Sequence, residues 1–308
     1  MEKLKKEFVE GKITKPDYIH QMYSQHKKLF EYSKFIKNTD IRKIEIEDGR
    51  VIITSRDLGI KIICEENDER IPPIETLNFN YYEKDESKMM YDLIEDNFTI
   101  FDIGANIGWY SIGITKAKIN IKIFAFEPIP KTYKNLLANI ELNKSQNIQT
   151  FNMGLYKEKT QLTFYFYPEL SGNASSINLS AESDSEIIKC DVDTMDNFVK
   201  EHNVTKLDFI KIDIEGAEFF AFEGGINTIK KFEPIVFTEM LRKWSAKFGY
   251  HPNKIIKLFK EKNYICFVVN EKGLSEIKEI TDDTIETNFF FLHRTKHSEQ
   301  IHRYCIKT

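Results

Sequence analysis

The sequence has little cysteine, and its cysteines are widely separated. The chain of 308 residues contains four of them, and no two form a C-x-x-C pair. Closely spaced cysteine pairs are the usual signal of a structural zinc site, and a high cysteine content in a short chain signals a disulfide framework. We therefore expect neither feature. We expect reduced and mostly buried thiols at Cys64, Cys190, Cys266 and Cys305.

Long apolar runs and a strong excess of one charge are also missing. No apolar run reaches the roughly 20 residues that cross a bilayer, and the start of the chain, MEKLKKEFVEGK, lacks the apolar centre of a signal peptide. The net charge of −4 disfavours a general binder of nucleic acid. We expect a cytoplasmic protein with no membrane span and no nucleic-acid partner.

A short apolar strand that runs into a glycine turn is the most informative segment. Residues 99–110 read TIFDIGANIGWY, with the spacing D-x-G-x-N-x-G in place of the dinucleotide pattern G-x-G-x-x-G. Such a turn places backbone N–H groups and a helix N-terminus beside a ligand. An acid just before the turn suits a cofactor with a nearby ammonium group, such as S-adenosylmethionine. The predicted cofactor contacts here are Asp102, Gly104, Ala105, Asn106, Gly108 and Tyr110.

Acidic residues also follow two later strands. Glu127 comes directly after the strand expected at 121–126, beside the glycine turn, and we predict that it accepts hydrogen bonds from a ribose diol. Residues 207–218 read LDFIKIDIEGAE, in which Asp213 and Glu215 follow a buried strand. We expect both carboxylates to contact the cofactor, and Glu215 to hold its methionine end. Asn152 and Gly154, after a third strand, are expected at the adenine edge.

S-adenosylmethionine donates a methyl group, and an acceptor hydroxyl would then need a base, or a metal that lowers its pKa. Asp213 is the first choice for the base. Glu239 ends the strand expected at 235–239 and is the next, although a strand-end acid in a salt bridge is an equal alternative. Together the two carboxylates offer oxygen ligands to a divalent metal ion. His251, in a loop, is a third candidate, although a lone loop histidine is more often neither base nor ligand.

Candidate substrate contacts lie in two loops. In the first, residues 170–177 read LSGNASSI, which suits a segment that folds over a ligand, although ordinary loop composition explains it equally well. Aromatic side chains of the second loop can stack on sugar rings, with core packing the stronger alternative for its tryptophan. The predicted contacts are Asn173, Ser175, Ser176, Lys243, Trp244 and Tyr250.

The order of expected elements predicts two parts. Residues 1–90 hold a helix over 16–37 and three strands over 41–64, separated by turns at Asp48-Gly49 and Leu58-Gly59, which together form a small α+β cap. Residues 91–308 alternate strand and helix, which predicts a mostly parallel, doubly wound sheet. We expect a hairpin between 155–156 and 161–167, and two antiparallel closing strands at 264–269 and 288–294. The cap covers the acceptor pocket, packs a homodimer partner, or does both.

Five motifs occur in the order found in one known family. They are FDIGANIG, FAFEP, the Thr194-Met195-Asp196 helix start, KIDIEGAE, and PIVFTE at 234–239. Over residues 97–269 the chain resembles the FkbM-type S-adenosylmethionine-dependent methyltransferases. The resemblance implies a class I methyltransferase (Rossmann-like) fold with a seven-stranded sheet. It also implies O-methylation of a hydroxyl group, which we expect on a nucleotide-linked sugar or a bacterial surface glycan, in polysaccharide biosynthesis.

Other functions stay open at this point. An N-methyltransferase acting on a small metabolite can use the same cofactor pocket, because a fold does not fix the acceptor. A non-catalytic cofactor-binding protein, whose carboxylates only stabilise strand ends, is a second alternative. A nicotinamide dehydrogenase is a weaker one.

Overall fold

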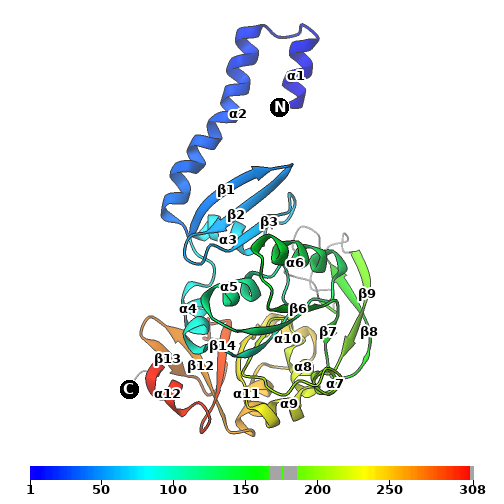
Figure 1. The fold of residues 1–308 in the computed structure, drawn as a ribbon, viewed down its shortest axis with the longest axis vertical. Helices are drawn as coiled ribbons and strands as arrows, with labels where there is room; N and C mark the ends of the chain where they lie inside the picture. The colour runs from blue at the N-terminus through cyan, green and yellow to red at the C-terminus, as the bar shows by residue number, and fades with distance from the viewer. Residues whose placement is uncertain (167–174, 177–185, 306–308) are drawn as a thin grey trace.

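The computed structural model describes residues 1–166, 175–176 and 186–305, and begins with a helical arm that projects from the body (Figure 1). The arm consists of α1 (Glu2–Val9), α2 (Lys15–Phe35) and the short 3₁₀ helix η1 (Ile36–Asn38). At the start of α2, the Thr14 hydroxyl oxygen accepts a hydrogen bond from the backbone N–H of Asp17. The rings of Phe8 and Tyr18 stack at 4.5 Å, which ties α1 to the outer part of α2.

A small antiparallel sheet connects the arm to the body. Its strands are β1 (Ile41–Glu47), β2 (Arg50–Ser55) and β3 (Lys61–Cys64), in that spatial order, so both expected turns are confirmed. Two helices follow, α3 (Pro72–Phe79) and α4 (Lys84–Leu93). The edge strand β3 is held by two asparagines of the body, since Asn139 Oδ1 accepts from the N–H of Ile63 and Asn143 Oδ1 accepts from the N–H of Lys61.

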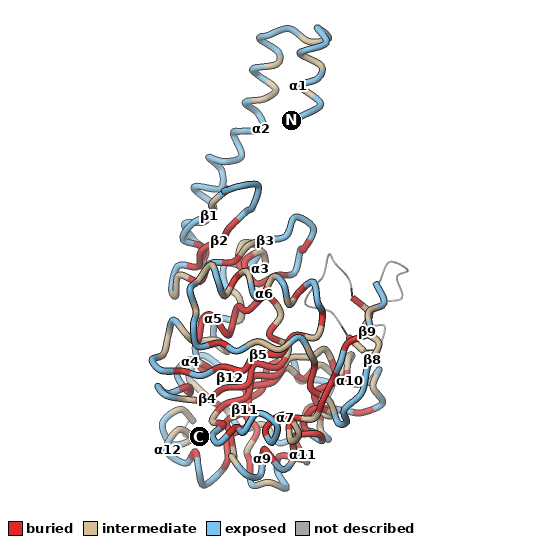
Figure 2. The backbone as a smooth tube through the Cα atoms, turned by 45° about the vertical axis from the view of Figure 1, so that its right-hand side comes forward, coloured by how far each residue is buried: buried red, intermediate tan, exposed pale blue. Residues whose placement is uncertain are grey.

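The body is built on an eight-stranded sheet whose centre is buried (Figure 2). Its spatial order is β13-β12-β14-β11-β10-β4-β5-β6, and the strands from β11 to β6 are parallel. This is the class I methyltransferase arrangement. The strands are β4 (Thr99–Ile103), β5 (Lys122–Phe126), β6 (Ile148–Phe151), β10 (Phe209–Ile212), β11 (Ile235–Glu239), β12 (Tyr264–Asn270), β13 (Gly273–Glu276) and β14 (Asn288–His293).

Two details of the expected sheet were wrong. The sheet has an eighth strand, β13, which follows β12 through a tight turn; its four residues, GLSE, are too short for a recognisable alternation. In addition, of the two expected closing strands only β14 is antiparallel to the central strands. Because β12 pairs antiparallel with β14, and β14 pairs antiparallel with β11, β12 is parallel to the central strands.

Helices cover both faces of this sheet, as the doubly wound pattern predicts. Alternate side chains of β4 enter different clusters: Phe101 packs with one face and Ile100 with the other. The first face is covered by α7 (Met195–Glu201), α8 (Glu218–Glu223), α9 (Ile226–Phe232) and α11 (Asn253–Lys260), and the second by α4, α5 (Trp109–Ala117) and α6 (Pro130–Asn143). The remaining helices are α10 (Arg242–Lys247) and α12 (Ser298–Tyr304).

A third sheet differs from the hairpin expected in this region. Its order is β7 (Gly154–Leu155), β9 (Glu186–Asp193) and β8 (Thr160–Phe166). Strand β8 pairs antiparallel with β9 and not with β7, because the eight residues of β9 offer a longer apolar partner. All four cysteines are free. Among the described residues, no helix combines the length and the apolar character needed to span a bilayer.

Candidate functional site

The acid that ends β4 is buried beneath the glycine turn. Asp102 Oδ2 accepts a hydrogen bond of 2.6 Å from the Ser111 hydroxyl, and Oδ1 lies 3.5 Å from Lys211 Nζ. Lys211 is itself buried and donates at 2.8 Å to the carbonyl oxygen of Gly104. The lysine therefore balances the charge of Asp102 and fastens β10 to the turn. Sequence reasoning did not assign Lys211 to the site, although it is the first residue of the motif KIDIEGAE.

Gly104 makes the close approach between β4 and β10 sterically feasible. Its φ of +76° lies in the left-handed region, and a Cβ at this position would lie 1.9 Å from the carbonyl oxygen of Asp213. Gly108 has a similar role lower in the turn, where a Cβ would lie 2.7 Å from Leu136 Cδ1. The two glycines thus bring the strand ends and helix α6 against the turn.

Glu127 is buried at the end of β5 and faces the same turn. Its two carboxylate oxygens accept from the N–H groups of Asn106, at 3.0 Å, and Ile129, at 2.9 Å. Burial raises the pKa of Glu127 to about 7, although these two hydrogen bonds oppose the shift. Each oxygen retains a free lone pair. The predicted ribose contact is therefore compatible with this geometry and stays a prediction.

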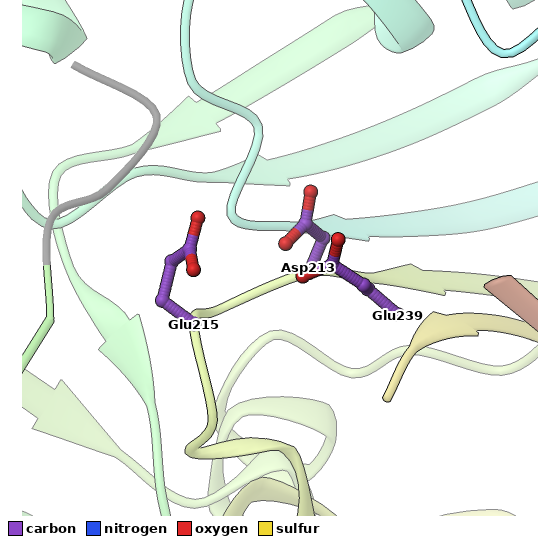
Figure 3. Close-up of side chains that lie close together, drawn as sticks. All are labelled: Asp213, Glu215 and Glu239. Atoms are coloured by element: carbon purple, nitrogen blue, oxygen red, sulfur yellow. The ribbon is translucent and has the colours of Figure 1, made fainter. Parts of the chain in front are cut away.

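Three carboxylates meet at the carboxyl ends of β10 and β11 (Figure 3). Asp213, Glu215 and Glu239, here called the acidic triad, each offer an oxygen within 4.8 Å of the others. Burial raises the pKa of all three, and the nearby carboxylates raise those of Glu215 and Glu239 further. Lys211, 3.9 Å from Asp213, opposes the shift for that residue.

Within the triad, Glu215 and Glu239 both lack charge partners at close range. Glu215 Oε2 is buried and accepts no hydrogen bond among the described residues. Glu239 forms no ion pair within 4.0 Å in the described part of the chain, so the structure does not favour its salt-bridge alternative. The acidic triad can therefore hold a cation, which suits an ammonium group or a divalent metal with oxygen ligands.

The loop that carries Asp213 and Glu215 is held in place by buried hydrogen bonds. Glu218 Oε1 accepts from the N–H groups of Ile214 (3.0 Å) and Gly216 (3.2 Å), and burial raises its pKa to about 7. The Tyr250 hydroxyl donates to the carbonyl oxygen of Gly216 at 2.9 Å. The structure thus places Tyr250 among the buried supports of the loop and not on the cavity wall.

The triad, Glu127 and the glycine turn line one cavity of about 370 Å³, within the range of small-ligand sites. Of the predicted residues, those on its wall are Gly104, Ala105, Asn106, Tyr110, Glu127, Asp213, Glu215 and Glu239.

The opposite wall comes from a segment that sequence reasoning did not assign to the site. It begins before α3 and ends at α4, and it contributes Arg70, Pro72, Glu75, Phe79, Tyr81, Tyr82 and Glu83. Glu83 joins this wall to the body, because it accepts hydrogen bonds from the Tyr110 hydroxyl and, at 2.9 Å, from the Asn288 side chain. No motif occurs in residues 70–83, so the sequence did not indicate that this segment lines the cavity.

Several predicted residues lie outside the cavity wall. His251 is exposed, and its Nδ1 accepts from the N–H of Asn253 at 3.2 Å. The Asn152 amide donates to the carbonyl oxygens of Glu127 and Pro128, at 2.9 and 3.0 Å. Gly154 and Ser176 line a smaller neighbouring hollow.

The other predicted substrate contacts are placed as follows. Trp244 is half-buried, and Lys243 Nζ lies 4.4 Å from the centre of its ring. The Ser175 hydroxyl donates to the carbonyl oxygen of Glu215 at 3.3 Å, which brings its loop to the triad. Asn173 lies outside the described residues.

The sequence profile of the FkbM methyltransferase domain matches residues 102–266. The chain belongs to the FkbM methyltransferase family. This confirms the resemblance inferred from the ordered motifs. The matched region starts at Asp102 and includes Glu127, the acidic triad and β12 as far as Cys266, whereas the wall from 70 to 83 precedes it.

Individual members and relatives are only distantly similar. Methyltransferase 1 of Beauveria bassiana is 29% identical over 150 residues, which cover 42% of this chain and 59% of that protein, so the match spans about three fifths of that relative. Hexuronic acid methyltransferase AglP of Haloferax volcanii is 23% identical over 179 residues, covering 58% of this chain and 68% of AglP. A crystal structure of an FkbM methyltransferase from Methylobacillus flagellatus aligns with 18% identity and a TM-score of 0.43, over 70% of this chain and 52% of that one.

Proposed function

We propose that this FkbM family member transfers a methyl group from S-adenosylmethionine to a hydroxyl group of a sugar, carried on a nucleotide or within a bacterial surface glycan. One observation supports this above the others: the acidic triad, Glu127 and the glycine turn line a single cavity. The name of the hexuronic acid methyltransferase AglP supports a sugar acceptor. A cytoplasmic location, expected from the sequence, agrees with this role and stays a prediction.

The cavity fits S-adenosylmethionine better than a nicotinamide dinucleotide. A nicotinamide dinucleotide carries a negatively charged pyrophosphate. The described wall contains two cations, Arg70 and Lys211, and both already pair with carboxylates, so neither is free to bind that group. The carboxylates suit an ammonium group, and Glu127 suits a ribose. When bound, the cofactor supplies a methyl group on a positively charged sulfur.

Asp213 is our candidate for the general base. A sugar hydroxyl is a poor nucleophile at neutral pH, and its proton must pass to a group within hydrogen-bond reach. Asp213 lines the cavity, and Lys211, 3.9 Å away, favours its ionised form. Glu215 and Glu239 also line the cavity and are suited to hold the ammonium group of the cofactor, whose charge favours their ionised forms, or the hydroxyls of the acceptor. Orientation of the acceptor by such contacts supplies much of the rate.

The decisive experiment compares Asp213→Asn with an exposed control, Glu271→Gln. We expect Asp213→Asn to lower turnover by about 10²–10⁴-fold, as measured by S-adenosylhomocysteine release with a panel of nucleotide sugars, and to retain S-adenosylhomocysteine binding by calorimetry. Unchanged turnover would remove Asp213 as the base. A wild-type protein that binds NAD and not S-adenosylhomocysteine would refute the proposal as a whole.

A divalent metal at Asp213 and Glu239 is a separate proposal, and Glu215 supplies a third oxygen ligand within reach. The same turnover assay after treatment with a chelator tests it: activity that falls and returns with added Mg²⁺ or Mn²⁺ supports a metal. Full activity after chelation discards it. N-methylation is distinguished by the product, because methylated amines and methyl ethers have different carbon chemical shifts.

We also propose that a second copy of the chain covers the arm. Six large apolar side chains of α2 are about half exposed: Ile19, Tyr23, Leu29, Phe30, Tyr32 and Phe35. Helix α1 has eight residues against 21 in α2 and so covers only part of it. A second arm packed along α2 would shield from water the side chains that face it, and exposed apolar clusters of this kind mark protein–protein contacts.

A further inference from the structure

A second hollow lies beside the cavity along α3. Arg70, Glu75 and Phe79 line both spaces, and the hollow, of about 440 Å³, is completed by Glu69, Ile74 and Asn78. The shared residues make the two spaces immediate neighbours. The cavity itself has the size of a site for one small ligand, so an acceptor larger than a single sugar must extend beyond it. The hollow along α3 offers a path for that extension.

An exposed aromatic side chain, at the end of helix α3, lines this hollow. Phe79 is 68% exposed. It is the last residue of α3, and Asn80, with a φ of +73°, ends the helix directly after it. Two prolines at the start of α3 and the hydrogen bond from the Thr76 hydroxyl to the carbonyl oxygen of Pro72 fix the helix. Phe79 therefore presents a ring at a defined place beside the cavity.

Planar polar groups line the same hollow as this ring. The guanidinium group of Arg70 pairs with the Glu75 carboxylate at 2.5 Å, and Asn78 contributes an amide. These groups donate and accept hydrogen bonds in fixed planes. A pyranose has one face of C–H groups, which packs on an aromatic ring, and a rim of hydroxyl groups that each donate and accept. The combination of an aromatic face, an ion pair and an amide matches that chemistry.

We propose that the hollow lined by Arg70, Glu75, Asn78 and Phe79 binds a second sugar of a saccharide acceptor, next to the sugar that is methylated. This inference rests on the proposed function, and it gives the cap a role in acceptor choice. It also explains why a wall of the site comes from a segment outside the region that matches the FkbM family. The acceptor is then a saccharide of at least two units.

The test compares Phe79→Ala with wild type, using monosaccharides and the disaccharides built from them as acceptors. Ile285→Ala is the control, because Ile285 is 87% exposed and does not line either space. For a disaccharide acceptor, we expect Phe79→Ala to raise KM up to about tenfold, the loss of one aromatic contact, with kcat nearly unchanged. For a monosaccharide we expect a smaller rise in KM, because Phe79 also lines the cavity. Phe79→Trp, which keeps an aromatic face, should restore KM.

The outcomes separate this inference from the proposed function. If wild type methylates disaccharides and Phe79→Ala has the same KM, the inference is wrong and the function stands. If wild type binds S-adenosylhomocysteine but methylates no saccharide, the proposed function fails and the inference fails with it. Unchanged S-adenosylhomocysteine affinity in Phe79→Ala shows that the variant is folded and that the effect lies in the acceptor.

Discussion

The candidate site and the helical arm depart from the usual distribution of side chains in opposite ways. Beneath the glycine turn of the site, Asp102 and Lys211 are charged and buried, whereas on α2 of the arm Leu29 and Phe30 are apolar and about 60% exposed. Figure 2 shows this contrast between the buried centre of the sheet and the exposed arm. Buried charges and exposed apolar surfaces are the informative exceptions to ordinary burial. The first indicates a polar ligand and the second a protein partner.

The two departures also differ in how strongly the fold depends on them. A buried charge requires its partner at all times, because an unpaired charge in the interior is strongly destabilising. An exposed apolar side chain on a helix is tolerated until a partner arrives. The comparison therefore predicts that substitutions in the candidate site change the free energy of unfolding strongly and that substitutions on the arm change it little.

The largest effect is expected for Lys211→Met. Asp102 would remain buried with the Ser111 hydroxyl but without its cation, so we expect the free energy of unfolding to fall by about 3–5 kcal/mol. Urea denaturation measures this. Lys206→Met is the control, since Lys206 pairs with Asp208 near the surface, and its loss should cost less than about 1 kcal/mol. Equal losses in the two variants would contradict the importance of the buried pair.

A change of pH is expected to have an intermediate effect on the free energy of unfolding. Burial raises the pKa of Glu218 from 4.5 to about 7, so between these values the folded protein holds a proton that the unfolded chain has released. Stability therefore increases as pH falls from about 7 to about 4.5, by up to about 3 kcal/mol for this group. Glu218→Gln, which mimics the protonated acid, should reduce the slope of unfolding free energy against pH, and the slope that remains includes the share of Glu127, whose pKa is also about 7. An unchanged slope would show that Glu218 is ionised in the folded protein throughout this range.

The smallest effect on folding is expected for the double variant Leu29→Glu and Phe30→Glu. At dilutions where the wild type is monomeric, the free energy of unfolding should change by less than about 0.5 kcal/mol. At higher concentration, light scattering should give twice the chain mass for the wild type and a single chain mass for the variant. Lys27→Gln with Lys28→Gln, which lowers the net charge of the chain by the same amount, is the matched charge control on the same helix. A monomeric wild type at all concentrations would refute the pairing of arms.

The sequence predicted the elements whose signals are local. The glycine turn, the alternation of strand and helix and the two hairpin turns of the cap depend on neighbouring residues, and these were confirmed. The direction of β12 and the partner of β8 depend on distant segments. For these two features the predictions, an antiparallel β12 and a hairpin between 155–156 and 161–167, were wrong. Local patterns fix which residues form a strand, whereas the partner of a strand is decided by the packing of the whole sheet.

The candidate site shows the same limit. Asp213, Glu215 and Glu239 could be placed together because parallel strands end at one edge of the sheet. Tyr250 follows the same region of the chain, yet its hydroxyl is used by the backbone of Gly216. Arg70 and Phe79 reach the cavity from α3 and the segment before it, and no periodicity or motif in residues 70–83 indicates that position.

The asparagines that hold β3 decide where this chain can be shortened. Removing residues 1–90, the proposed cap, would leave the Asn139 and Asn143 amides of α6 without the strand they bind, and would delete the wall that carries Phe79. Removing only residues 1–38 keeps all of these contacts. A trimmed protein for crystallisation or ligand screening should therefore begin at Thr39, and a cut at residue 91 should yield insoluble material.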